Sequence, residues 1–292
     1  MKQQHGKPYP DDDEFKSLAR QHQSRFRENY LKVGCKVYGN ILEEEDASRG
    51  LIFYDDFGIL QAVRNRYGPE YKDTLYANLL RSEHIPFNFF VPMMYDPGCT
   101  KKVFNELVGG IVNEIKEFKI EWAPSPARAY LNDRTSIDTC IWYKHKDGQK
   151  GVFGIEVKYT ERGYALSGET ERRAIGNQSS RYWLVTRNSG LFIPGYEMKL
   201  VKDDFRQIWR NHLLGESMKQ KGDIGHFNSI TFYPEGNTHF QKAIPEYREM
   251  LTNKDAVIGI TYENFFDVLQ KYSRIDRYNL WIEYLRRRYL CK

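Results

Sequence analysis

Residues 154–161 read Gly-Ile-Glu-Val-Lys-Tyr-Thr-Glu, and residues 133–138 upstream read Asp-Arg-Thr-Ser-Ile-Asp. Both segments lie among apolar residues typical of buried strands, yet each also carries ionisable side chains. Side chains alternate along a strand, so Glu156 and Lys158 share one face, and Asp138 is the acid of the preceding strand. Burying a carboxylate or an ammonium costs several kcal/mol unless a partner compensates for the lost hydration. Two acids and a lysine on one sheet therefore predict a divalent cation together with a phosphate.

The composition is that of an ordinary globular protein, and it permits several classes of partner. The 292 residues are 28% charged, with a net charge of +5 that allows an anionic partner without requiring one. The four cysteines are scattered without a Cys-x-x-Cys pair, which favours a reducing, cytoplasmic location and no structural zinc site. Residues 1–14 are polar and acidic, so we expect no signal peptide. The longest apolar run, residues 87–95, is far shorter than the ~20 residues of a membrane helix, so we expect no membrane partner.

Apolar spacing predicts the elements that precede the two acid-bearing strands. An apolar stripe at helical spacing, from Phe104 to Phe118, predicts a helix over Cys99–Phe118. Gly109-Gly110 within this helix indicates close packing against another element. Residues Lys119–Ala123 are predicted as a strand, followed by a long hairpin loop to Asp133.

The later segments continue the alternation of helices and strands. They are predicted as a loop from Glu161 to Ser180, a strand at Tyr182–Thr186, a helix from Asp203 to its cap at Gly222, a strand at Ser229–Tyr233, a helix at His239–Leu251, a strand at Ala256–Ile260, a helix capped by Thr261, and a last helix at Asp276–Leu290. The last helix carries Arg286–Arg288, for which a solvated helix end is favoured over contact with a DNA backbone. We expect one α/β unit, with residues 1–97 as a helical N-terminal extension and residues 98–292 as the core with C-terminal helices.

The order helix, strand, strand with Asp138, strand with Glu156-x-Lys158, helix and strand resembles the PD-(D/E)XK nuclease superfamily. Three segments are similar in sequence to restriction-endonuclease-like bacterial members of this superfamily: residues 133–138, 154–161 and 207–214. The last of these reads Gln-Ile-Trp-Arg-Asn-His-Leu-Leu. Other Glu-x-Lys triplets in the chain lack an apolar strand with an aspartate in the strand before it. The resemblance covers about residues 99–237, and Ile137 stands where the family motif often has proline.

This resemblance implies a restriction-endonuclease-like core, with a mixed central sheet flanked by helices in the order αβββαβ. Asp138 and Glu156 would hold Mg²⁺, with Mn²⁺ as the substitute, because hard cations prefer carboxylate oxygens. Lys158 would orient or help deprotonate the attacking water and stabilise charge on the scissile phosphate. The implied activity is hydrolysis of DNA phosphodiester bonds by an endonuclease, in restriction, phage defence or repair. A homodimer is implied by analogy, because cutting both strands of a duplex usually needs two active sites.

A further acid is expected at such a site, and the sequence leaves three candidates. A hairpin centred near residues 129 and 130 would place Glu121 opposite Asp138. Glu106 and Glu114 lie on the predicted preceding helix, where the superfamily often supplies an acid. The solvated surface is the stronger interpretation for both of these helix glutamates.

Helix residues and alternative functions complete the expectations. Gln207, with Arg210 and Asn211 on the same helix turn, would contact phosphate or position the lysine, and a plain surface face is equally compatible with the pattern. His145, His212 and His226 have no recognised ligand spacing, so no metal is assigned to them. The alternatives are a non-catalytic nucleic-acid-binding protein with this fold, a buried Glu156–Lys158 ion pair of purely structural importance, and an unrelated α/β protein.

Overall fold

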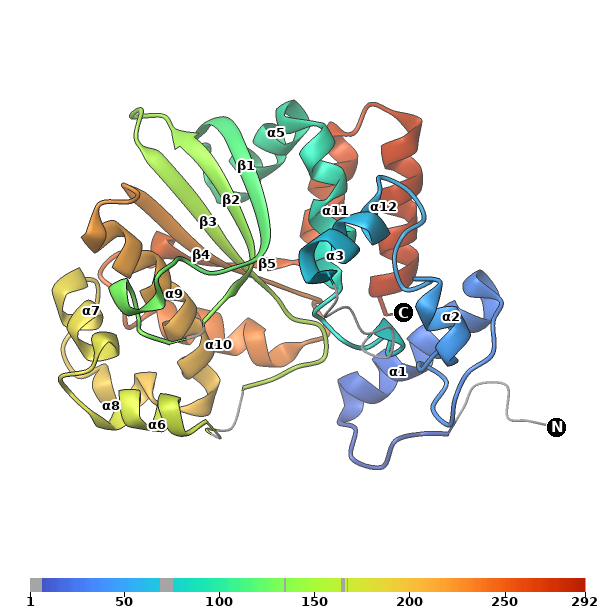
Figure 1. Cartoon of the computed structure of the whole chain (residues 1–292), viewed down its shortest axis with the longest axis horizontal. Coiled ribbons are helices and arrows are strands. Elements are labelled where there is room, and N and C mark those ends of the chain that lie inside the picture. The colour runs from blue at the N-terminus through green and yellow to red at the C-terminus, as the bar shows by residue number, and fades with distance from the viewer. Residues whose placement is uncertain (1–6, 69–75, 134, 164–165, 167, 292) are drawn as a thin grey trace.

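The central feature of the fold is a five-stranded mixed sheet (Figure 1). The computed structural model describes residues 7–68, 76–133, 135–163, 166 and 168–291. The strands follow one another in space as they do in the chain: β1 Val112–Trp122, β2 Ile137–His145, β3 Lys150–Val157, β4 His226–Tyr233 and β5 Val257–Thr261. β2 pairs antiparallel with both β1 and β3, whereas β4 pairs parallel with both β3 and β5.

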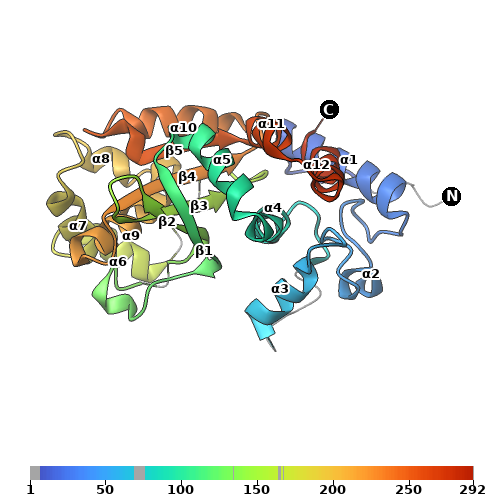
Figure 2. The ribbon, with the colours of Figure 1, turned by 90° about the horizontal axis from the view of Figure 1, so that it is seen from above.

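Helices cover both faces of this sheet. The described helices are α1 Glu14–Phe26, α2 Glu44–Ser48, α3 Ile59–Tyr67, α4 Ile85–Phe90, α5 Pro97–Val108, α6 Glu169–Gly176, α7 Arg181–Ser189, α8 Glu197–Leu200, α9 Asp203–Lys221, α10 Thr238–Arg248, α11 Tyr262–Tyr272 and α12 Asp276–Tyr289. Helices α4, α5, α11 and α12 share one apolar cluster with the sheet, and α7, α9 and α10 form the cluster on its other face (Figures 1 and 2). The order α5-β1-β2-β3-α9-β4 confirms the predicted αβββαβ core. Among the described helices, none is both long and apolar enough to cross a membrane.

The helix predicted over Cys99–Phe118 is wrong in its second half. Helix α5 ends at Val108, and Gly109 and Gly110 both adopt a left-handed conformation, with φ of 86° and 77°. Asn105 reinforces this end, because its side chain hydrogen-bonds both the N–H and the carbonyl of Val112. The glycine pair therefore ends the helix rather than marking close packing within it.

Strand β1 imitates helical periodicity because its pairing with β2 is irregular. The register shifts between Val112 and Glu114 and again between Ile115 and Glu117. Each bulge adds one residue to a strand, so the next inward-facing residue comes three positions later instead of two. Val112, Ile115 and Phe118 thus all contact the same apolar cluster. The helix prediction used Ile111, Ile115 and Phe118, whose spacings of four and three fit a helix as well as this bulged strand.

Two other expectations between β3 and α9 are also corrected. Residues Tyr182–Thr186 were expected to form a strand but belong to helix α7, which packs against α9. A short run of aromatic and branched residues fits a buried helix as well as a strand, and here the packing decides. Helix α6 lies in the stretch predicted as a loop, and none of its described side chains is buried, so it lacks the apolar stripe that sequence patterns detect.

The N-terminal helices share a core with the end of the chain. Helix α1 lies beside α12 (Figures 1 and 2), with the ring of Phe26 in edge contact with Tyr284. The Arg288 side chain is fully buried, and its guanidinium donates to the Tyr284 hydroxyl at 2.6 Å. The expectation of a solvated helix end is therefore wrong for Arg288, while Arg286 and Arg287 pair with acids at the surface. The division of the chain at residue 97 stays a prediction.

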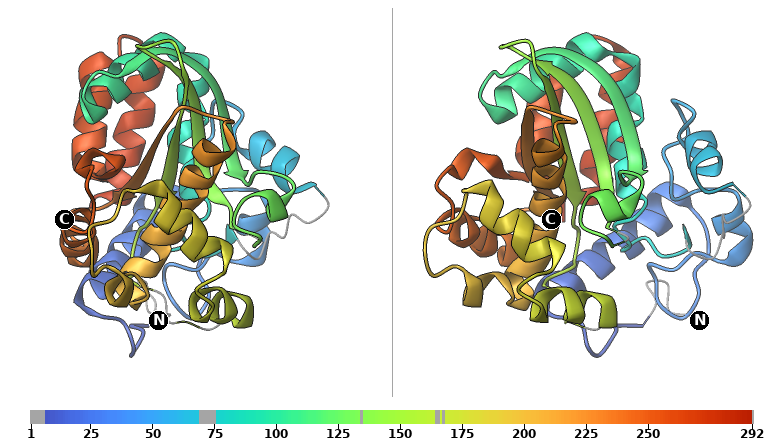
Figure 3. Two further views of the ribbon diagram at one scale, coloured as in Figure 1. Left: turned by 90° about the vertical axis from the view of Figure 1, so that its left-hand side faces the viewer. Right: turned by 60° about the vertical axis from the view of Figure 1, so that its left-hand side comes forward.

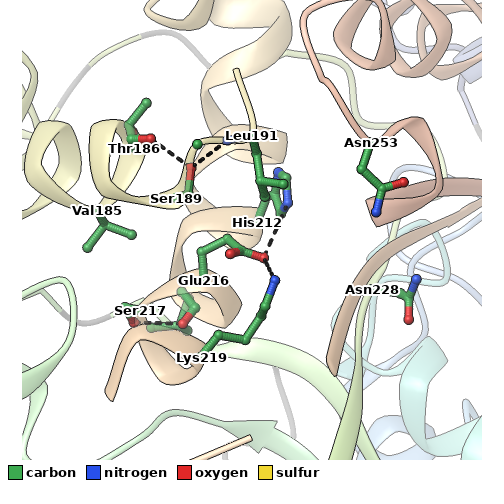
Figure 4. A network of polar contacts seen from close by, with 12 residues as sticks. Val185, Thr186, Ser189, Leu191, His212, Glu216, Ser217, Lys219, Asn228 and Asn253 are labelled. Carbon is green, nitrogen blue, oxygen red and sulfur yellow. Dashed lines mark hydrogen bonds and ion pairs between the residues drawn. The ribbon is translucent and has the colours of Figure 1, made fainter. Parts of the chain in front are cut away.

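Helix α9 buries polar side chains as well as apolar ones (Figure 4). His212 is fully buried, with its Nδ1 atom 3.2 Å from the Tyr247 hydroxyl of α10 and its Nε2 atom 3.9 Å from the Glu216 carboxylate. Glu216 also accepts a hydrogen bond from Lys219 at 2.9 Å. Burial, with a smaller contribution from Lys219, lowers the pKa of His212 to about 3. The imidazole is therefore neutral in the folded protein at neutral pH.

We expect this histidine to make the fold sensitive to mild acid. Its pKa is about 3 in the folded protein and about 6.5 when unfolded, so below pH 6.5 the unfolded chain binds a proton that the folded protein does not. Stability should be fully present above pH 6.5 and fall by up to ~1.4 kcal/mol per pH unit as the pH drops toward 3. Chemical denaturation from pH 7.5 to 5 should show a shallower fall for His212→Asn. Identical profiles would contradict this assignment.

Candidate active site

Glu156 and Lys158 lie at the end of β3, in the interior of the protein. Their exposed fractions are only 8% and 3%, and the Lys158 ammonium donates to Glu156 Oε1 at 2.7 Å. Helix α9 supplies two more donors, because Gln207 Nε2 lies 2.7 Å from Oε1 and Asn211 Nδ2 lies 2.8 Å from Oε2. Both oxygens of Glu156 are therefore hydrogen-bonded, which offsets the cost of burying the carboxylate.

Asp138 lies beside Glu156 on the neighbouring strand. The register pairs Thr139 with Ile155 and Cys140 with Gly154, which puts Asp138 opposite Glu156. Asp138 Oδ2 accepts a hydrogen bond from the Val157 amide at 2.7 Å, so the side chain reaches across to β3. Burial raises the pKa of Asp138 well above its usual value, and Glu156 raises it further, whereas Lys158 acts in the opposite direction.

Glu121 is the third acid at these strand ends. The pairs Ile120 with Thr139 and Trp122 with Ile137 place Glu121 opposite Asp138, in the register predicted from the hairpin. Its backbone has a φ of 53°, a left-handed conformation that is uncommon for a residue other than glycine, and Arg66 holds its carbonyl oxygen at 2.5 Å. Burial raises the pKa of Glu121 to about 7, with Glu156 as the next cause.

These carboxylates repel one another although Lys158 and Arg66 lie nearby. Glu121, Asp138 and Glu156 occupy successive strands at one level of the sheet, and the pKa values of Glu121 and Asp138 are raised by burial and by their acidic neighbours. Bringing a cation among them would relieve this repulsion and favour their ionised forms. An all-carboxylate set of oxygen donors suits a hard divalent cation such as Mg²⁺. The residues present therefore fit the metal that the sequence predicted.

The other two candidate acids lie elsewhere. Glu114, expected on a helix, lies on β1 and forms an exposed ion pair with Lys116 at 2.6 Å. Glu106 lies on α5 and contacts Lys271 and the Tyr272 hydroxyl of α11. Of the three glutamates, Glu121 is the one whose electrostatic interactions include Glu156 and Lys158.

Glu83 approaches the same group from the N-terminal part of the chain, and sequence analysis did not single it out. Burial opposes its ionisation, but its hydrogen bond with Arg81 and the nearby Lys158 lower its pKa overall. Glu83 is also among the groups that raise the pKa of Glu121. Only the folded chain brings this residue to the strand ends, so no local pattern could have indicated it.

A cavity of about 850 Å³ opens beside the acids. Its walls come from the β1–β2 loop, the start of β2, the end of β3 and helices α6, α7 and α9. They include Asp138, Glu156, Gln207, Arg210 and Tyr182. Asp133 anchors the loop wall, accepting hydrogen bonds from Thr135 and from the Tyr182 hydroxyl. Arg134 lies outside the described residues. A space of this size accommodates a nucleotide-sized group next to the carboxylates.

The backbone around Lys158 is held from three sides. Its amide donates to Phe232 of β4 at 2.8 Å, and its carbonyl accepts from the Tyr262 hydroxyl at 2.6 Å. Asn237 then binds the carbonyl oxygens of Tyr159 and Glu161. The chain that follows β3 is thus held by β4, by α11 and by Asn237. This fixed backbone orients the Lys158 side chain toward Glu156.

Comparison with known proteins agrees with this geometry. A family model described as the PD-(D/E)XK nuclease superfamily matches residues 10–291, nearly the whole chain. A search of curated proteins and a search of solved structures each found no match. The family match includes the N-terminal segment as well as the αβββαβ core. This chain therefore belongs to the PD-(D/E)XK nuclease superfamily.

Proposed function

We propose that this protein is a metal-dependent DNA endonuclease that hydrolyses phosphodiester bonds at the strand ends of β1, β2 and β3. The observation that carries this proposal is the convergence of Glu121, Asp138, Glu156 and Lys158 beside a nucleotide-sized cavity. Membership of the nuclease superfamily supports the reaction class. The choice of DNA over RNA and the setting in restriction, defence or repair belong to the proposal.

In this proposal each side chain has a separate task. Asp138 and Glu156 would hold Mg²⁺, or Mn²⁺ in its place, and Glu121 would complete the set of carboxylate oxygens. The bound cation would supply Lewis-acid stabilisation of the scissile phosphate and activation of the attacking water. Lys158 would orient that water and stabilise negative charge developing on the phosphate. Gln207 and Asn211 would act as positioning residues, since they hold Glu156 rather than the cavity's contents.

Cleavage of supercoiled plasmid by the purified protein tests the proposal directly. With Mg²⁺ or Mn²⁺ we expect nicking or linearisation that disappears in EDTA and falls by about 10²–10³-fold in Lys158→Gln. Glutamine can still donate to Glu156, which limits structural damage. Lys144→Gln is the matched control, because Lys144 is exposed and pairs with Lys150 at the far end of β2.

Two outcomes of this experiment would contradict parts of the proposal. Equal activity in Lys158→Gln and Lys144→Gln would contradict the proposed role of Lys158. Metal-independent, salt-sensitive DNA binding without cleavage would overturn the hydrolase proposal and favour a non-catalytic binding protein. Parallel reactions with single-stranded DNA and with RNA test which nucleic acid is the substrate. Gel filtration of the protein under the conditions that linearise the plasmid tests whether it acts as a homodimer.

Replacing Gln207 should change how the protein uses its metal. Gln207→Ala removes one donor from Glu156, and loss of such a supporting contact costs about 10–100-fold in metal affinity or activity. We expect a higher Mg²⁺ concentration for half-maximal cleavage. Gln220→Ala is the control on the same helix, because Gln220 binds the Val185 carbonyl instead. An unchanged Mg²⁺ dependence would argue against a positioning role.

Asp138→Asn should stabilise the metal-free protein while abolishing its response to metal. The substitution removes a buried charge near two other acids, and the new amide oxygen can still accept from the Val157 amide. Relief of strain at a functional site of this kind is commonly worth ~0.5–2 kcal/mol. Thermal unfolding in EDTA should show a higher midpoint than the wild type, and added Mg²⁺ or Mn²⁺ should raise only the wild-type midpoint. A lower midpoint in EDTA would contradict the proposed repulsion.

A further inference from the structure

The far end of the β2–β3 hairpin carries a second group of metal-ligating side chains. His145 ends β2, Asp147 lies in the turn and His226 begins β4. His145 Nδ1 lies 2.9 Å from Asp147 Oδ1, and His226 Nε2 lies 2.7 Å from Asp147 Oδ2. The three ligand atoms all lie within 4.8 Å of one another. Sequence spacing gave no signal of this group, because four of the described helices, α6 to α9, lie between β3 and β4 in the chain.

This group is distinct from the candidate active site. His145 lies seven positions after Asp138 along β2, and at ~3.3 Å per position the two are about 23 Å apart. The hairpin tip points away from the N-terminal helices (Figures 1 and 3). The two groups also differ chemically, since one consists of carboxylates and the other combines two imidazoles with a single carboxylate.

The backbone holds the three ligands in place without any ion. His145 and Gln149 are joined by a backbone hydrogen bond of 2.9 Å that closes the turn, and the Gln149 amide also donates to Asp147 Oδ1 at 2.9 Å. His226 pairs with Gly151 in the β3–β4 ladder.

The surroundings leave the group accessible. The imidazole rings of His145 and His226 stack with centroids 3.7 Å apart, and all three ligands are exposed or half-buried. Lys144 and Lys150 pair at the preceding position of the hairpin, where strand alternation directs them to the opposite face. Lys146 extends toward Gly110 instead, with its ammonium 3.7 Å from where a Cβ atom of that glycine would lie.

We propose that His145, Asp147 and His226 form a binding site for Zn²⁺ that joins the β2–β3 hairpin to the start of β4. Imidazole nitrogen and carboxylate oxygen are ordinary zinc ligands, and three protein ligands leave a fourth, tetrahedral position for water. Ligand atoms of such a site lie ~3.3 Å apart, given metal–ligand distances of ~2.0–2.1 Å. The present contacts of 2.7 and 2.9 Å end on different oxygens of Asp147, and the three ligand atoms lie within 4.8 Å of one another, so binding the ion requires the side chains to rotate toward a common point.

Zinc at this site ties together segments that are distant in the sequence. His145 and Asp147 belong to one turn, whereas His226 follows α9. An ion that binds the folded protein in preference to the unfolded chain raises its stability in proportion to the logarithm of the ion concentration. The site therefore clamps the hairpin tip to β4, and it does so whether or not the protein cuts DNA.

Titration of the EDTA-stripped, full-length protein tests the site. With the carboxylates of the candidate active site saturated by excess Mg²⁺, isothermal titration with Zn²⁺ should give one site per chain that weakens at least tenfold in His226→Asn and in Asp147→Asn. Zn²⁺ should raise the thermal midpoint of the wild type but not of these variants. Co²⁺ should give the intense visible absorption of a tetrahedral nitrogen–oxygen site, without the thiolate bands that would reveal binding by a cysteine.

Two control variants locate the ion. His22→Asn removes a histidine that binds the Arg287 carbonyl outside the group, and it should leave Zn²⁺ affinity unchanged. Asp138→Asn should likewise retain the Zn²⁺ site. Loss of Zn²⁺ binding in Asp138→Asn with retention in His226→Asn would overturn the proposal by assigning the ion to the carboxylates. Absence of any Zn²⁺ binding by the wild type would overturn it as well.

Discussion

The arrangement of the candidate site depends on the hydrogen bonds that converge on Glu156. Lys158 comes from the same strand, whereas Gln207 and Asn211 come from α9, so the contacts that offset a buried charge also fix the helix against the sheet. An uncompensated buried carboxylate is strongly destabilising. The position of α9 is therefore coupled to the Glu156 side chain, because a shift of the helix would break the hydrogen bonds that Gln207 and Asn211 donate to its two oxygens.

Two glycines allow α9 to approach closely enough for these bonds. The ring of Phe227 on β4 fills the space beside Gly154 of β3 and beside Gly215 of α9. A Cβ atom at Gly154 would lie 2.4 Å from this ring, and one at Gly215 would lie 2.1 Å from it. Any larger residue at either position would push the helix away from the sheet. Gly154, two residues before Glu156, therefore sets how closely α9 approaches β3, and so the distance between Glu156 and the side chains of Gln207 and Asn211.

The sequence could predict the parts of the site that depend on local order. Strand alternation and hairpin symmetry relate Asp138, Glu156 and Glu121 through their positions alone, and the register has this pairing. The end of α5 was harder to predict from the sequence, because the bulges in β1 give the apolar residues of that strand a helix-like spacing. The run Tyr182–Thr186 has no intrinsic preference that separates a buried helix from a strand. Gln207 and Asn211 of α9 were expected to contact phosphate or the lysine. Their hydrogen bonds to Glu156 depend on how α9 packs against the sheet, which a sequence pattern cannot reveal.

Glu83 shows how far the site depends on residues remote from its motif. The next residue, His84, is buried before α4, and burial, together with Arg288, lowers its pKa well below the usual value. The neutral imidazole can then accept from the Arg288 guanidinium at 2.9 Å, and Arg288 also donates to the Ile52 carbonyl. A fully buried arginine keeps its charge, so it requires these acceptors and fixes the segments that carry them. The last helix thereby sets the position of the segment that brings Glu83 to Lys158. The N-terminal segment therefore contributes to the electrostatics of the site through Glu83, and it lies within the residues that the family model matches.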